Sequence, residues 1–173
     1  DATSRTYARF FEAETTAAAF EVFWRYAERH GLPRALYTDG DSIYRSERQA
    51  RADEELRGTG PETQFARAMR TLGVELIVAH SPQAKGRVER RNGLLQDRLV
   101  KALRLEGIST LEEANRYLEE KYLAELNERF TTKASGRADL HRPLGRGLDL
   151  GEVLCFEEPR VVRRDWTMSW RNR

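Results

Sequence analysis

Apolar residues recur at or near the i, i+3, i+4, i+7 spacing of one helix face in four stretches of this chain. They predict helices over residues 14–30, 61–72, 86–105 and 111–130. Gly31 and Gly73 follow the first two helices as C-terminal stops. Ser109 and Glu112 have the spacing of a capping box before the fourth. The third helix is predicted to face the core with Val88, Leu95, Leu99, Ala102 and Leu103.

Short runs of apolar and β-branched residues alternate with these helices and predict strands. The runs cover residues 1–11, 34–38 and 74–79, and the polar stretch 41–60 between the last two reads as a hairpin or loop with a short helix around 52–56. The order strand, helix, strand, helix, strand, helix, helix predicts an α/β domain with a mixed sheet and flanking helices.

The pattern changes after residue 130. Residues 131–150 are rich in Gly, Arg and Pro and predict a linker. Beyond them, residues 153–156 and 160–170 have the composition of strands of a further small β unit, with Trp166 and Trp170 packed on one face. We therefore divide the chain into a core over 1–130, a linker over 131–150 and the beginning of another domain over 151–173.

Composition restricts the class of protein. The 173 residues are 39% hydrophobic and 34% charged, and no apolar run approaches the roughly 20 residues of a membrane helix. Cys155 is the single cysteine, which excludes a disulfide within the chain and a Cys-rich zinc site and fits a reducing, cytoplasmic setting. The chain has no initiator Met, and we expect it to be a fragment.

Net charge is only +2, but the basic residues are concentrated. Residues 85–104 contain seven basic residues and only two acidic ones, Glu89 and Asp97. The basic residues are Lys85, Arg87, Arg90, Arg91, Arg98, Lys101 and Arg104. Such a stripe favours a polyanionic partner. The alternative is a solvated helix face.

Two carboxylates stand at the ends of predicted elements. Asp39 ends the strand at 34–38, and Glu89 lies in what is predicted to be the first turn of the helix at 86–105. Mg²⁺ prefers such hard oxygen ligands, completed by waters and phosphate oxygens. The alternatives are turn chemistry at Asp39-Gly40 and a salt-bridging acid at Glu89. Asp41 is a second choice in place of Asp39.

Residues beside these acids suit a phosphate backbone. Gly40 and Gly86 lack a Cβ and permit close approach. The arginines around Glu89 can form fork-like contacts with phosphate. His80 is a weaker candidate, because a lone His has no partner at metal-ligand spacing.

Residues 1–130 resemble the integrase-type catalytic core of DDE transposases, with insertion-sequence transposases of the ISNCY kind the most similar. Three segments carry the resemblance: Asp1-Ala2-Thr3-Ser4-Arg5, Tyr37-Thr38-Asp39, and the long stretch from Ser81 to Arg90 that contains Glu89. Residues 148–173 look like the start of the small β-barrel domain that follows this core. The resemblance implies an RNase H-like fold.

The resemblance also implies a function, namely metal-dependent DNA cleavage and strand transfer during transposition. Asp39 and Glu89 would be the second and third catalytic, metal-binding carboxylates, with two Mg²⁺ or Mn²⁺ ions in the full-length enzyme. The implied partners are double-stranded DNA (transposon ends and target) and further copies of the chain, in the bacterial cytoplasm at the nucleoid and without a membrane. The implied DNA contacts are Lys85, Arg87, Arg90, Arg91 and Gln96.

One expected feature of the family is missing. Its first catalytic Asp sits on a strand before the Asp1-Ala2-Thr3-Ser4-Arg5 segment, and Asp1 is not its equivalent. We therefore expect the chain alone to have little catalytic activity. The alternatives are a catalytically incompetent remnant that binds nucleic acid and another RNase H-like, metal-dependent nuclease.

Overall fold

The structure, a computed structural model, describes residues 3–50, 55–56, 60–79, 82–134, 136 and 139–169, without the side chains of 82–85 and 87. Predictions for most of the short helix around 52–56, for His80 and for Trp170 lie outside these residues.

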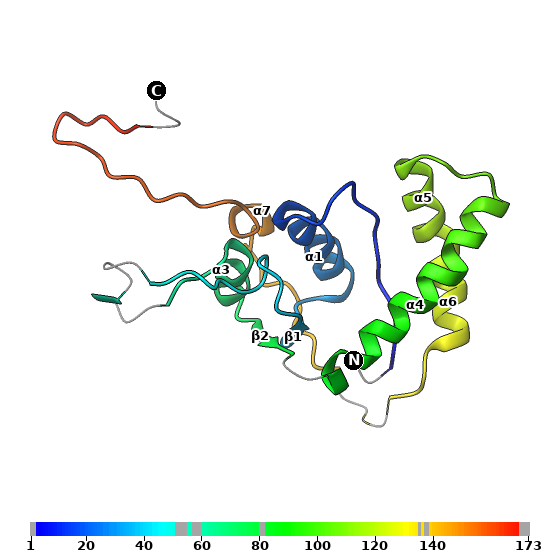
Figure 1. Cartoon of the computed structure of the whole chain (residues 1–173). Helices are drawn as coiled ribbons and strands as arrows, with labels where there is room; N and C mark the ends of the chain where they lie inside the picture. The colour runs from blue at the N-terminus through cyan, green and yellow to red at the C-terminus, as the bar shows by residue number, and fades with distance from the viewer. Residues whose placement is uncertain are drawn as a thin grey trace.

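A pair of parallel strands forms the centre of the α/β part (Figure 1). Strand β1 (Ala35–Thr38) pairs with β2 (Glu75–Val78) in a register that runs from Ala35↔Glu75 to Thr38↔Val78. The α/β class is therefore confirmed. The predicted mixed sheet is wrong for the described residues, which contain this parallel pair and no strand over 3–11.

Helices α1 (Thr16–His30) and α3 (Gln64–Thr71) pack against each other beside this pair. Phe65 stacks on Phe20 with ring centroids 5.9 Å apart and meets Phe23 edge-on at 6.2 Å. Burying each such ring stabilises the fold by about 2–3 kcal/mol. Helix α3 starts three residues later than Pro61 because the Thr63 hydroxyl caps it, accepting from the Ala66 amide at 3.1 Å.

The second part of the molecule is helical. Helix α4 (Pro82–Leu105) lies beside a helix made of α5 (Leu111–Tyr117), the π-helical turn η1 (Leu118–Tyr122) and α6 (Leu123–Phe130) (Figure 1). Leu99 of α4 packs with Leu118 and the other buried side chains of the helix from α5 to α6. The capping residue of α5 is Thr110, whose hydroxyl accepts from the Glu113 amide, so the predicted Ser109 cap is wrong by one position.

Segment 3–11 belongs to no sheet and is held mainly by side chains, with one backbone bond from the Thr132 amide to the Thr3 carbonyl. The Asn115 amide accepts from the Phe10 N–H at 2.8 Å and donates to the Phe10 carbonyl at 3.0 Å. Asn127 makes the same two bonds with Thr6, at 2.7 and 2.9 Å. The predicted strand is thus wrong for the described residues 3–11, and the backbone of Thr6 and Phe10 is paired instead with two asparagines of the helix from α5 to α6.

Ion pairs join the two parts through this segment. Arg9 lies 3.2 Å from Glu21 of α1 and 3.9 Å from Glu119 of η1, and Glu119 also pairs with Arg29. His30 is half-buried at this seam against the rings of Tyr7 and Tyr26, and burial is the main reason that its pKa is lowered.

Several residues after 138 are bound to the α/β part. Arg142 pairs with Leu32 through two 2.8 Å backbone hydrogen bonds, and its guanidinium donates to the carbonyls of Leu72 and Gly73. Leu150 and Leu154 are buried in the same core as Phe65. The division of the chain at residue 130 stays a prediction. The contacts of Arg142, Leu150 and Leu154 show that residues beyond that boundary pack against the α/β part.

The two strands expected in the last quarter of the chain are wrong for the described residues. Leu150–Val153 forms the short helix α7, and residues 157–169 contain no strand and extend away from the body (Figure 1). Trp166 is 90% exposed at a turn closed by the Trp166 N–H and the Arg163 carbonyl, so the expected packing of this ring is wrong too.

Candidate metal and nucleic-acid site

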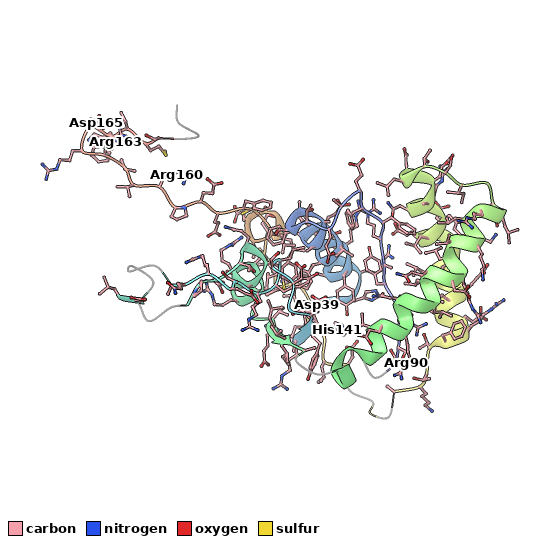
Figure 2. All side chains as sticks on the ribbon, in the orientation of Figure 1. Asp39, Arg90, His141, Arg160, Arg163 and Asp165 are labelled. Carbon is pink, nitrogen blue, oxygen red and sulfur yellow. The ribbon has the colours of Figure 1, made fainter. Side chains whose placement is uncertain are left out.

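The carboxyl ends of β1 and β2 meet at one edge of the sheet. Thr38 pairs with Val78, and the Ala79 amide donates to the Thr38 carbonyl at 2.7 Å. Asp39 follows immediately and is exposed at this edge (Figure 2). The end of a parallel strand is the usual place for ligand sites in α/β sheets.

The Asp39 carboxylate keeps capacity for a ligand. Its Oδ1 accepts from the Asp41 amide at 3.2 Å, and a Cβ at Gly40 would meet no atom within 4 Å. Asp41, the second choice, makes the same kind of bond but a shorter one, because its Oδ1 accepts from the Ile43 amide at 2.8 Å. The geometry is consistent with ranking Asp39 first.

Acidic side chains near this edge affect the pKa of Tyr44. Tyr44 packs edge-on against Phe65 at 5.2 Å, and its pKa is raised, first by burial and then by the charges of Glu14, Asp39 and Asp41. Tyr44 therefore stays a neutral phenol at physiological pH.

Glu89 is exposed on α4, but further from the helix start than predicted. The helix begins at Pro82 instead of Gly86, so the residues expected as a loop are its first turn. Glu89 lies about 10 Å along the axis from Pro82, at 1.5 Å per residue. Stabilisation of its charge by the helix dipole is correspondingly smaller than expected, because that effect fades after the first turn. Its neighbour Val88 is 58% exposed, so its prediction as core is wrong.

Asp39 and Glu89 offer the oxygen donors that Mg²⁺ or Mn²⁺ prefers, and two carboxylates with waters and phosphate oxygens are a common set. Within the described part of the chain, neither has an ion-pair partner, and no group of three His, Cys, Asp or Glu side chains is placed to hold a metal. The donor chemistry thus fits a two-carboxylate site. A separation of the two carboxyl groups of about 8 Å or less, as sharing of metal ions requires, stays a prediction.

A groove of about 650 Å³ runs between segment 4–8 and the N-terminal half of α4, with Phe130 and Thr132 at its end. Arg90 lines it and is exposed (Figure 2). Arg91 also lines it but is half-buried, donating to the Ser4 carbonyl at 2.7 Å and lying over the Phe130 ring at 5.9 Å. Gln96 is exposed, and the side chains of Lys85 and Arg87 lie outside the described ones. Sequence patterns missed Arg5 and Thr132 as groove residues, because nothing local in the sequence marks them.

The two described histidines, His30 and His141, have structural partners. The His141 ring contacts the Tyr26 hydroxyl at 2.5 Å and the Asp139 carboxylate at 2.6 Å. Burial, and secondarily the charge of Asp139, raises the pKa of Tyr26. His141 therefore fastens the segment after residue 138 to α1, which the sequence did not indicate.

No helix among the described residues is both long and apolar enough to cross a membrane.

We compared the sequence and the structure with known proteins to identify related families. No family model matches the sequence. The protein "Putative transposase y4bF" of Sinorhizobium fredii is 40% identical over 163 residues, covering 94% of this chain and 34% of that protein. The "Transposase for insertion sequence IS1202" of Streptococcus pneumoniae is 35% identical over 168 residues, covering 96% of this chain and 34% of that protein.

A solved structure is also similar, namely the cryo-EM structure of the simian T-cell lymphotropic virus intasome in complex with PP2A regulatory subunit B56 gamma. It matches 61% of this chain and 33% of its own at 21% identity, with a TM-score of 0.45, which is too low to establish a shared fold. The chain spans about one third of the length of its two curated relatives. Over nearly its whole length, the chain is a homologue of transposases, as its sequence motifs predict.

Proposed function

We propose that the chain forms part of the catalytic core of a DDE transposase with an RNase H-like fold. In this proposal Asp39 and Glu89 are the second and third metal-binding carboxylates. The substrates are double-stranded transposon ends and target DNA, and the working complex contains several copies of the protein. These statements concern the whole protein, and the chain spans about one third of the length of its two curated relatives.

The arrangement of β1, β2 and α4 is the observation that supports this proposal best. Asp39 is exposed where the two parallel strands end, and residues 79–81 alone separate β2 from the helix that carries exposed Glu89. The helix that carries Glu89 thus follows the strand that pairs with the strand ending at Asp39, in a chain homologous to transposases.

The residues have separate tasks in this proposal. Asp39 and Glu89 hold Mg²⁺ or Mn²⁺, which supplies polarisation of a phosphodiester and activation of the attacking water or hydroxyl. Exposed Arg90 contacts a DNA phosphate and positions the backbone without reading its sequence. Open space at Gly40 leaves room for the phosphate beside Asp39.

Metal binding to the chain in solution tests the proposal. Mn²⁺ is titrated into the ¹⁵N-labelled chain, and paramagnetic broadening of amide signals is followed. We expect the signals of Gly40 and Arg90 to broaden over the same Mn²⁺ range, since both lie next to the proposed ligands. Asp39→Asn and Glu89→Gln should each shift that range upward by about tenfold or more, because each removes a charged ligand.

Asp97→Asn is the matched control, because Asp97 is an exposed acid on the same helix and pairs with Lys101. It should leave the broadening of Gly40 unchanged. Broadening of Gly40 and Arg90 at unrelated Mn²⁺ concentrations, or its insensitivity to Asp39→Asn, would overturn the two-carboxylate site.

A further inference from the structure

The turn after β1 is organised by Asp41. Its backbone amide donates to Asp39 Oδ1 at 3.2 Å, and its own carboxylate accepts from the Ile43 amide at 2.8 Å. Its carbonyl accepts from the amides of Tyr44 and Arg45, both at 3.0 Å. Asp41 thus connects the candidate ligand Asp39 to the chain that follows.

The far end of this turn is anchored in the core. Ile43 is 8% exposed and belongs to the same buried cluster as Phe65. Tyr44 packs edge-on against the Phe65 ring. The Ile43 amide, which the Asp41 carboxylate binds, is therefore fixed relative to α3. Asp41 is held in turn, and its backbone amide orients the Asp39 carboxylate.

Asp39 and Asp41 each accept from the backbone amide two residues further on, in the manner of an Asx turn, but the bond of Asp41 is the shorter, at 2.8 Å against 3.2 Å. Asp39 is exposed, and its long 3.2 Å bond orients Oδ1 while leaving Oδ2 available. A ligand held in one orientation binds a metal better than a freely rotating one, because less conformational freedom is lost on binding.

From this arrangement we propose that Asp41 is a positioning residue that holds the Asp39 carboxylate in its metal-binding orientation and is not itself a ligand. The inference rests on the proposed function, since it assigns Asp41 a role toward the metal held by Asp39. It requires an oxygen acceptor at position 41 and does not require a negative charge there.

This difference sets the test. Asp41→Asn keeps an oxygen that can accept from the Ile43 amide but removes the charge, whereas Asp41→Ala removes both. With the Mn²⁺ titration followed at Gly40, we expect the midpoint of Asp41→Asn to stay within about twofold of the unmodified chain. The midpoint of Asp41→Ala should rise roughly fivefold, the equilibrium effect of one hydrogen bond.

Hydrogen exchange at the Ile43 amide provides a second readout. It should accelerate in Asp41→Ala and remain slow in Asp41→Asn. If Asp41→Ala loses the dispersed amide spectrum of the folded chain, the test rests on Asp41→Ser and Asp41→Asn, which both remove the charge and keep an acceptor. The shorter serine side chain can still accept from the Ile43 amide, so this variant should bind Mn²⁺ as tightly as Asp41→Asn.

The possible failures are distinguishable. Equal, large losses of Mn²⁺ binding in Asp41→Asn and Asp41→Ala would make Asp41 a ligand and overturn the inference. Unchanged binding in Asp41→Ala would overturn it as well. If instead Asp39→Asn has no effect, the proposed function fails first, whatever the Asp41 variants do.

Discussion

Arg90 and Arg91 are neighbours in sequence, but α4 turns them toward different surroundings. Arg90 is exposed beside the groove, whereas Arg91 binds the Ser4 carbonyl and lies over the Phe130 ring. A basic stripe read from sequence therefore contains residues with two different tasks. Arg90 is the better candidate for DNA, and Arg91 fastens segment 3–11 to the helical part.

Arg90→Ala should accordingly weaken binding of double-stranded DNA and reduce the slope of log affinity against log salt by about 0.9, the value of one lost phosphate contact. Fluorescence anisotropy at several salt concentrations measures both quantities. Arg116→Ala, which removes an exposed arginine of α5, should change neither. Arg91→Ala should instead lower the free energy of unfolding by about 1–3 kcal/mol, because it removes a charged hydrogen bond. An unchanged salt slope in Arg90→Ala would remove this residue from the DNA surface.

Among the elements, the segment around Arg142 acts as part of the α/β domain. It pairs with Leu32 directly after α1, and Gly31 makes this approach possible. Gly31 has φ +82° and ψ −178°, a conformation that is essentially restricted to glycine. A Cβ there would lie 2.5 Å from the Arg142 carbonyl oxygen.

Gly31→Ala should therefore lower the free energy of unfolding by about 1–3 kcal/mol from backbone strain alone, with the clash in addition. Urea denaturation measures this change, and limited proteolysis within residues 132–141 should become faster as the Arg142 contact is lost. Gly145→Ala is the control, since a Cβ there meets no atom within 4 Å. Equal stabilities of the two variants would contradict the role assigned to Gly31.

At the scale of the whole molecule, two hydrophobic clusters share the chain. One contains α1, α3, the strands and α7, and the other contains α4 with the long helix from α5 to α6. The candidate ligands lie on elements that pack in different clusters, because Asp39 follows β1 and Glu89 lies on α4. Their separation therefore depends on how the contacts of segment 3–11 hold the clusters together.

For the chain as a whole, we expect little or no joining of duplex DNA in Mg²⁺, because the described residues contain no third ligand beside Asp39 and Glu89. A gel assay with labelled oligonucleotide duplexes measures cleaved and joined products separately. Efficient joining would show that two carboxylates suffice, and cleavage without joining would favour the alternative of an RNase H-like nuclease. DNA binding without either product is the expected result for this chain.

Local signals predicted the helices and the strands β1 and β2 well, but they wrongly predicted strands over 1–11, 153–156 and 160–170 and did not predict which segments pair. The 3.6-residue pattern located α1, α3, α4 and the helix after Thr110, and the acids at the ends of β1 and within α4 were visible directly. Helix α4 starts four residues before the predicted Gly86, at Pro82, because proline suits the first position of a helix. The side-chain hydrogen bonds of Asn115 and Asn127 were not predictable, because they join positions more than 100 residues apart. The same limit applies to Arg142 with Leu72, since such contacts are determined by packing.

The π turn η1 has a consequence for how this protein tolerates changes in length. Twelve regular α-helical residues would place Asn115 and Asn127 about 120° apart around the axis, at 100° per residue. The wider turn between them takes up part of that angle, so that both amides reach the five residues from Thr6 to Phe10. Deleting one residue of η1 would give a more regular helix but swing Asn127 away from Thr6. The irregular turn therefore sets the relative orientation of Asn115 and Asn127. An insertion or deletion there would require a compensating change in the segment from Thr6 to Phe10.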